Sequence, residues 1–218
     1  EHAQYVHFGA TSQDIINTGL MLRFRQMLNL QEQVLQTLLG RLVKLAQEHA
    51  NLPMVARTYG QDAALTSFGA IVATWGNPLV DLLNALPDLR QTSLWVSLSG
   101  AAGTSVALGK DAPVARAGLA KSLGLGNPER SWHSDRSPIL RIVNWQSALC
   151  AALGKMAEDT LILRQSNIKT VNLGQSGASS TMPQKQNPVS AGVITALATH
   201  VTALNSSLQA SAQHAQQR

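Results

Sequence analysis

Two adjacent hydroxyl side chains, Ser179 and Ser180, lie in a stretch, 175–188, that is rich in small residues. Glycine and serine give such a segment a mobile backbone whose amides can approach a ligand closely. Lys185 adds a positive charge, and Asn187 can both donate and accept hydrogen bonds. The stretch ends in a proline directly before an apolar-periodic segment, and the N-terminus of a helix attracts anions. These features suit a site for a carboxylate, although composition alone equally fits an ordinary surface loop.

The order of residues in this stretch resembles the signature loop of the fumarase/aspartase superfamily, G-S-S-x-M-P-x-K-x-N-P, with Ala178 in place of the glycine. The resemblance implies β-elimination, or its reverse, on substrates that carry carboxylates. It also implies that Ser179 is the base that removes a proton next to a carboxylate. We further expect 175–188 to be poorly ordered in the absence of ligand. The other loop residues expected to contact the substrate are Ser180, Met182, Lys185 and Asn187.

A second block, 5–14, has good helix-capping residues in Thr11, Ser12 and Asp14. It resembles the first shared region of the superfamily, H-x-G-x-T-S-x-D. That resemblance implies that Thr11 and Ser12 bind a substrate carboxylate beside a helix start. His7 matches the histidine of the pattern and is a further candidate for ligand contact, although we favour a structural role for it. Asp14 is interpreted as a helix cap.

A third block, 56–61, resembles the second shared region, R-T-H-G-Q, but Tyr59 stands where the superfamily keeps histidine. In adenylosuccinate lyases and their relatives that histidine acts as the general acid or helps to position it. The resemblance assigns substrate contacts to Arg57, Thr58, Tyr59 and Gln61. Without it, the block would be interpreted as a polar helix start with a half-buried tyrosine.

Composition limits the class of protein. The chain has 218 residues, of which 44% are hydrophobic and 4% aromatic, which indicates a helix-rich globular protein with a good core. The net charge is +5 and the pI about 9.8, yet no two basic residues are adjacent, which argues against a nucleic-acid-binding arm. The basic balance favours anionic substrates. The single cysteine, Cys150, excludes an internal disulfide and is expected to lie in the core.

No signal peptide and no membrane-spanning stretch is evident, so the cytoplasm is the default location. The chain starts without methionine just before a motif, and the superfamily resemblance implies further helices on both sides. We therefore expect 1–218 to be the central helical-bundle domain of a longer polypeptide.

Apolar residues at helical spacing predict long helices. Leu28, Leu35, Leu38, Leu42 and Leu45 define one face of a helix over 13–49. A second helix is predicted from Ala63 to about Leu86, interrupted at Gly76-Asn77-Pro78. Further helices are expected over about 111–123, 138–166 and 189–208. The small-residue segment 95–108 resembles the superfamily's G-A-x-G-T turn, with strand as an alternative.

The absence of convincing alternation predicts an all-α fold, a long-helix bundle of the fumarase/aspartase type with shallow packing angles. The segment around Trp132 and His133 resembles one that borders the active site in these lyases. The histidines lack metal-ligand spacing, and we expect neither a metal nor another cofactor. The resemblance implies a homo-oligomer, a tetramer whose active sites are shared between subunits, with no membrane or nucleic-acid partner.

Within the superfamily the chain is most similar to the cycloisomerases that convert 3-carboxy-cis,cis-muconate to 4-carboxymuconolactone in protocatechuate degradation. Three features carry this resemblance: the H-F-G-A-T-S-Q-D block, the S-S-T-M-P-Q-K loop and the aromatic Tyr59. The implied partner is a small polycarboxylate. Three alternatives stay open: an adenylosuccinate lyase-like β-elimination that releases fumarate, a non-catalytic structural relative, and a nucleic-acid-binding helical module.

Overall fold

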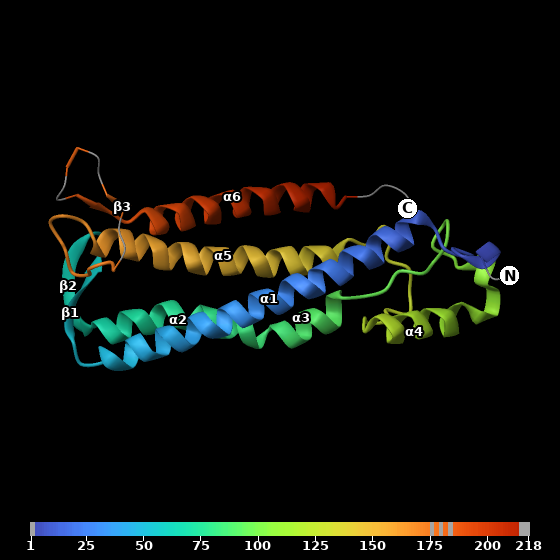
Figure 1. Ribbon diagram of the computed structural model, residues 1–218, viewed down its shortest axis with the longest axis horizontal. Helices are drawn as coiled ribbons and strands as arrows, with labels where there is room; N and C mark the ends of the chain where they lie inside the picture. Colours follow the sequence, from blue (N-terminus) through green and yellow to red (C-terminus); the bar gives the residue numbers. More distant parts are fainter. Residues whose placement is uncertain (1–2, 175–176, 179–180, 183–184, 214–218) are drawn as a thin grey trace. The chain divides into compact units, whose positions relative to one another are not determined.

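The computed structural model describes residues 3–174, 177–178, 181–182 and 185–213, and most of this chain is helical (Figure 1). In chain order the elements are η1 Ala3–Tyr5, α1 Ser12–Glu48, β1 Pro53–Thr58, β2 Gln61–Ser67, α2 Phe68–Asn84, α3 Leu86–Ser93, η2 Val106–Asp111, α4 Ala112–Leu123, α5 Ser137–Leu163, β3 Gly177–Ala178, β4 Gln186–Asn187 and α6 Val189–Ser211.

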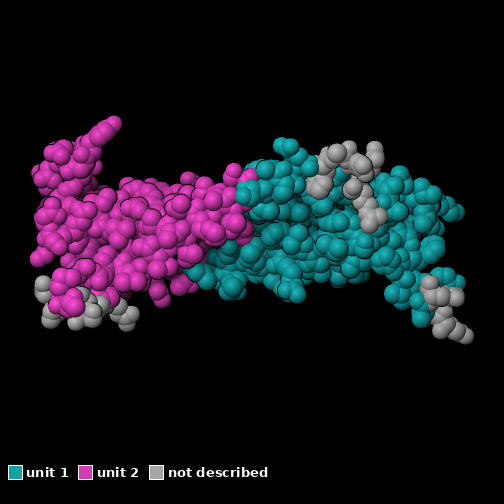
Figure 2. Space-filling view, turned by 90° about the horizontal axis from the view of Figure 1, so that it is seen from above, with its two compact units in different colours: residues 1–34, 84–144, 207–218 teal, residues 35–83, 145–206 magenta. Residues whose placement is uncertain are grey.

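The chain divides into two compact units, which Figure 2 colours separately. Unit 1 contains the start of α1, the elements α3 and α4, and the start of α5. Unit 2 contains the end of α1, the β1–β2 pair, α2, the rest of α5 and most of α6. Their bounds are Glu1–Val34, Asn84–Asn144 and Ser207–Arg218 for unit 1, and Leu35–Leu83 and Trp145–Ser206 for unit 2.

Unit 2 is a helix bundle whose members pack closely where the sequence supplies small residues. A Cβ atom at Gly69, near the start of α2, would lie 2.3 Å from the carbonyl oxygen of Ala46 on α1. A Cβ at Gly154 on α5 would lie 2.9 Å from the Cβ of Ala198 on α6. The indole of Trp75 on α2 donates to Asp159 on α5 at 2.6 Å. Glycine at these positions therefore permits close approach of the helix backbones.

Unit 1 has a core of its own around Leu28, Leu86, Val96, Trp132 and Ile142, which are all almost completely buried. The side chain of Arg25 on α1 donates to the carbonyl oxygen of Gly124, at the end of α4, at 3.1 Å. A cation at the C-terminus of a helix satisfies its free carbonyls and opposes its dipole. This contact ties α4 to the first half of α1.

A β-hairpin, β1–β2, replaces the beginning of the second predicted helix. The strands are antiparallel with Thr58 opposite Gln61, and α2 begins only at Phe68 rather than at Ala63. The first five residues of β2 are all exposed, so the strand carries none of the apolar-polar alternation that marks a half-buried strand. The expectation that no strand occurs was therefore wrong for this segment, while the mainly helical, lyase-type fold is confirmed.

Two other expectations about helix boundaries had different outcomes. Helix α2 continues through Pro78 instead of breaking there, because Trp75 and Leu79 on either side of the proline are buried and hold both halves of the helix in place. The break near Pro87 is confirmed, since α3 starts at Leu86. Residues 95–108 are mostly irregular, with one bridge between Trp95 and Gly126 and a 3₁₀ turn in η2.

The predicted apolar faces of α1 and α6 differ in how far they are buried. On α1, Leu28, Leu35 and Leu42 are buried as predicted. On α6, five of the six predicted apolar positions are at least 40% exposed in the single chain: Val189, Val193, Leu197, Leu204 and Leu208.

The described residues contain no helix long and apolar enough to cross a membrane. Cys150 is half-buried on α5 rather than fully enclosed, and its burial raises the pKa of its thiol. Raising that pKa keeps the thiol protonated and unreactive at neutral pH.

Candidate active site

The start of α1 shows one half of a capping box. Thr11 directly precedes the helix, and its backbone N–H donates to a carboxylate oxygen of Asp14 at 3.0 Å. The residue three positions inside the helix thus satisfies the amide at the helix start. Asp14 is confirmed as a cap. Thr11 is buried, whereas Ser12, the first helical residue, is exposed.

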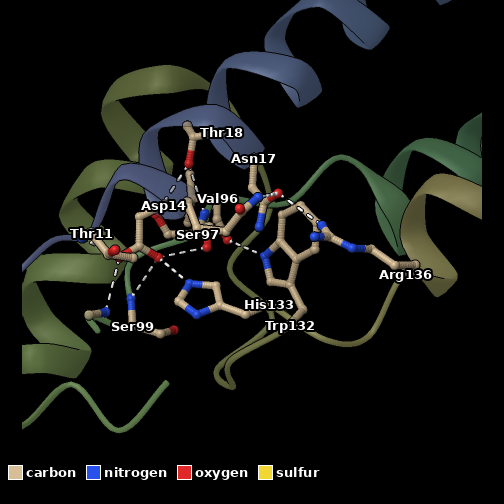
Figure 3. Close-up of polar contacts among 12 residues, drawn as sticks. Thr11, Asp14, Asn17, Thr18, Val96, Ser97, Ser99, Trp132, His133 and Arg136 are labelled. Carbon is tan, nitrogen blue, oxygen red and sulfur yellow. Dashed lines mark hydrogen bonds and ion pairs between the residues drawn. The ribbon is translucent and has the colours of Figure 1, made fainter. Parts of the chain in front are cut away.

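Asp14 does more than cap the helix, since it lies at the centre of a buried hydrogen-bond network (Figure 3). One carboxylate oxygen accepts the hydroxyl of Ser97 at 2.7 Å and the amide of Ser99 at 3.0 Å. The other also accepts the amide of Gly100 at 3.0 Å. Because the Asp14 side chain has no exposed surface, these donors replace the water that a charged carboxylate would otherwise require.

The imidazole of His133 completes this network. Its Nε2 lies 2.7 Å from a carboxylate oxygen of Asp14, and the ring points directly at the carboxylate in Figure 3. Since an ionised carboxylate only accepts hydrogen bonds, Nε2 must carry the hydrogen. Burial alone would raise the pKa of Asp14, but hydrogen bonds from His133, Ser97, Thr11 and Gly100 outweigh it and hold that pKa below its usual value.

Further contacts attach the small-residue segment after α3 to the start of α1. The hydroxyl of Thr18 donates to the carbonyl of Ser97 at 3.2 Å and accepts the amide of the same residue at 2.9 Å. The indole of Trp132 donates to the carbonyl of Val96 at 2.8 Å. These hydrogen bonds therefore join three segments that are remote in sequence, in the part of unit 1 that carries Thr11 and Ser12.

Arg136 extends this network toward α5. Its guanidinium donates to the side-chain oxygen of Asn17 at 3.0 Å, and the same oxygen accepts Gln13 at 2.8 Å. Burial lowers the pKa of Arg136, which still stays far above neutrality because arginine is always protonated in proteins. Unit 1 thus offers a helix N-terminus with a fixed arginine in the adjoining network, an arrangement that attracts anions.

His7 is exposed and has a backbone φ of +69°, so it does not pack into the core. The structural role that the sequence favoured for it finds no buried contact. Histidine is one of the residues that tolerate this left-handed conformation. His7 stays a candidate ligand residue near the start of α1.

Tyr59 occupies the tip of the β1–β2 hairpin in unit 2. Tyr59 and Gly60 form a two-residue loop with φ angles of +52° and +72°, the pattern of a type I′ turn. The relative exposure of the tyrosine is 105%, so the side chain projects fully into solvent. The alternative of a half-buried tyrosine at a helix start was therefore wrong.

The other residues of this block lie on the hairpin strands. Arg57 is half-buried, and its Nε lies 3.2 Å from the carboxylate of Asp62 on the facing strand. Thr58 and Gln61 are exposed and flank the turn as a cross-strand pair. This arrangement groups Thr58, Tyr59 and Gln61 at one exposed tip.

The signature loop is described only in part. Ser179 and Ser180 lie outside the described residues, so their assignment stays a prediction. Around them, Gly177 pairs with Asn187 and Ala178 with Gln186 in the short β3–β4 ladder, directly before α6. Lys185 and Met182 are exposed, and the amide of Lys185 donates to the carbonyl of Met182 at 2.9 Å.

The predicted site residues are divided between the two units. Thr11, Ser12 and His7 belong to unit 1, whereas the hairpin residues and the described part of the loop belong to unit 2. Among the residues that the structure describes, no group of three or more His, Cys, Asp or Glu side chains could hold a metal ion.

Comparison with known proteins places this chain in a family. The lyase family matches residues 1–203 of the chain. The chain belongs to this family. Family membership fits the three sequence blocks, which recur here in the expected order with Tyr59 as the main departure.

Individual members of the lyase family are also similar. The 3-carboxy-cis,cis-muconate cycloisomerase of Pseudomonas aeruginosa is 39% identical over 95% of this chain and 46% of its own length. The adenylosuccinate lyase of Pyrococcus horikoshii is 31% identical over 87% of this chain and 43% of its own length. The solved 3-carboxy-cis,cis-muconate lactonizing enzyme of Pseudomonas putida gives a TM-score of 0.89 at 35% identity and covers 97% of this chain and 47% of its own. This lyase-family chain thus spans about half the length of these relatives.

Sequence reasoning missed the network around Asp14. His133 was associated with the site only through the family resemblance, and Ser97 and Ser99 were not singled out. A carboxylate in the first turn of a helix is already explained by capping, so the sequence carried no local signal for the additional donors that surround Asp14.

Proposed function

We propose that this chain is the central part of a cofactor-independent cycloisomerase that forms 4-carboxymuconolactone from 3-carboxy-cis,cis-muconate. The supporting observation is the similarity to cycloisomerases of that name over 95% of the chain. The exposed Tyr59 at the hairpin tip, in the position of the superfamily's histidine, agrees with this substrate.

The leaving group explains why tyrosine suits this position. Lactone formation adds a carboxylate oxygen to one carbon of a double bond and a proton to the neighbouring carbon. In the reverse direction the leaving group is a carboxylate, whose pKa of about 4 lets it depart without protonation. An amine or hydroxide needs an acid to leave. A site without histidine at this position is therefore suited to lactone chemistry.

We assign the proton transfer next to the carboxylate to Ser179. A serine is a weak base in water, so its alkoxide must be stabilised by nearby amides and positive charge. Lys185 and the N-terminus of α6 supply that charge in the described part of the loop. The same groups stabilise the dianionic intermediate that forms when a proton leaves the carbon beside a carboxylate.

We further propose that the active site is shared between chains in a homotetramer. Helix α1 has 37 residues and is therefore about 55 Å long. A helix of this length exceeds what one small bundle needs. The superfamily resemblance implies that the region of Thr11 and Ser12, the region of Thr58 and Gln61 and the Ser179 loop come from different subunits. The exposed apolar stripe on α6 offers a surface for such assembly.

An adenylosuccinate lyase-like β-elimination is the second candidate, supported by 31% identity to an adenylosuccinate lyase. In that case the general acid would have to come from residues outside this chain or from Tyr59 itself. The two proposed reactions therefore differ in whether Tyr59 could be needed as the general acid.

Assays of the full-length protein with 3-carboxy-cis,cis-muconate and adenylosuccinate, side by side, test the proposal. Lactone formation from the first substrate alone supports it, whereas fumarate release from the second alone supports the alternative. Turnover of neither would favour a non-catalytic relative. Sedimentation of the same preparation should give a tetramer, and a monomer would contradict the shared site.

A further inference from the structure

Beside the signature loop, unit 2 contains a hollow of about 790 Å³ between the end of α5 and the start of α6. Three cationic side chains line it: Arg164, Lys169 and Lys185. Of the 12 Asp and Glu residues in the chain, none is among the lining residues, although 17 Lys and Arg leave only a modest overall excess. The hollow is therefore far more positive than the chain as a whole.

None of these three cations forms an ion pair with a carboxylate in the described part of the chain. Arg164 is half-buried and donates from Nη2 to the side-chain oxygen of Gln186 at 2.7 Å. Its Nε is buried and has no acceptor among the residues that the structure describes. Buried donors without a partner are rare because each one costs stability, so this guanidinium retains unused capacity to donate a hydrogen bond.

Lys169 has an unusual backbone. Its φ is +46°, in the left-handed region that favours glycine and disfavours a long side chain. The loop after α5 could adopt this turn more easily with glycine at position 169. The exposed ammonium group of Lys169 thus lines the hollow even though the left-handed backbone costs conformational free energy.

We infer that Arg164 and Lys169 bind a carboxylate of the substrate in addition to the one that Lys185 contacts. This inference rests on the proposed function and extends it, because it makes the site selective for tricarboxylates over dicarboxylates. The planar guanidinium donates to the carboxylate from its N–H groups, and the ammonium adds a flexible positive charge. When a ligand lacks the extra carboxylate, the donors that would bind it stay unpaired, which costs binding free energy. The site therefore binds the dicarboxylate more weakly than the tricarboxylate.

Two small acids provide a matched pair of probes. Tricarballylate and glutarate share a three-carbon backbone between their terminal carboxylates and differ in one central carboxylate. Their binding to the full-length protein is measured by titration calorimetry, without any need for turnover. We compare the wild type with Arg164→Gln, Lys169→Gly and the control Lys121→Gln, which removes an exposed lysine of α4 outside the hollow.

Arg164→Gln should weaken tricarballylate binding about tenfold, because a half-buried charged hydrogen bond is lost. Lys169→Gly should weaken it about threefold, since exposed ion pairs contribute less, and glycine suits the local backbone. Glutarate binding should change by less than twofold in both variants, and Lys121→Gln should alter neither. Arg164→Lys should restore part of the affinity while keeping the charge.

Equal loss of both acids in either variant would overturn the inference, as would no loss of tricarballylate. Thermal unfolding of Arg164→Gln and Arg164→Lys checks that the fold survives. The outcome is independent of the proposed reaction. If 3-carboxy-cis,cis-muconate is not turned over but tricarballylate selectivity depends on Arg164 and Lys169, the reaction assignment fails and the carboxylate site stands.

Discussion

Replacing Asp14 by asparagine tests whether the buried network at the start of α1 supports the fold. The two carboxylate oxygens of Asp14 accept five hydrogen bonds. An asparagine keeps only one acceptor oxygen. Its NH₂ group replaces the other oxygen and then faces groups that can only donate hydrogen bonds. In the better orientation, the backbone amides of Thr11 and Gly100 lose their acceptor. The substitution is nearly isosteric, so the effect isolates hydrogen bonding from packing.

Each buried donor left without an acceptor costs about 1–3 kcal/mol, so Asp14→Asn should reduce the free energy of unfolding by about 2–6 kcal/mol. For a chain of this size that corresponds to a fall in Tm of about 4–24 °C. Circular dichroism at equal protein concentration gives the measurement. The control Asp81→Asn alters an exposed carboxylate on α2 and should change stability by less than about 0.5 kcal/mol.

The pH dependence supplies an independent check. Because the folded-state pKa of Asp14 lies below its ordinary value of 3.8, its ionised form stabilises the fold above that pH. This contribution is lost as the pH falls below 3.8 toward the lower folded-state pKa. The Tm difference between wild type and Asp14→Asn should therefore be constant near neutrality and shrink in acid. A gap that widens on acidification, or a variant as stable as wild type at pH 7, would refute the account.

Two further substitutions test the chemistry in the full-length enzyme. Ser179→Ala should lower kcat by roughly 10² or more, the usual effect of removing a positioned proton-transfer group, with Ser180→Ala less damaging. A larger effect at Ser180 would show that the base is the neighbouring hydroxyl. Tyr59→Phe should keep activity within about tenfold and leave the alkaline limb of the pH–rate profile unchanged, because a carboxylate leaving group needs no acid. Loss of turnover together with that limb would instead identify Tyr59 as a proton donor.

The sequence predicted the long helices because their signal is local. The leucines of α1 repeat within each turn, so Leu28, Leu35 and Leu42 identify a buried face without knowledge of what they contact. The extent of α4 also follows from local signals, since Pro113 lies in its first turn and Gly124 caps its end with a φ of +60°.

The hairpin and the Asp14 network required information that no local window contains. Strand β2 is exposed along most of its length, so it has no alternation, although the Tyr59-Gly60 pair could have been considered as a turn. Asp14 meets its partners Ser97 and His133 across 83 and 119 positions of sequence. Spacing patterns cannot detect such contacts, and only the superfamily resemblance connected the segment of His133 with a site.

The tight turn at the tip of β1–β2 also limits how this protein could change its chemistry over time. A left-handed backbone at position 59 excludes β-branched side chains but accepts histidine readily. Exchange between tyrosine and histidine at this point therefore needs no rebuilding of the hairpin, since the side chain is fully exposed within its own chain. A projecting position of this kind lets a lineage gain or lose a proton donor by one substitution, without any change in the packing of the helices of its own chain.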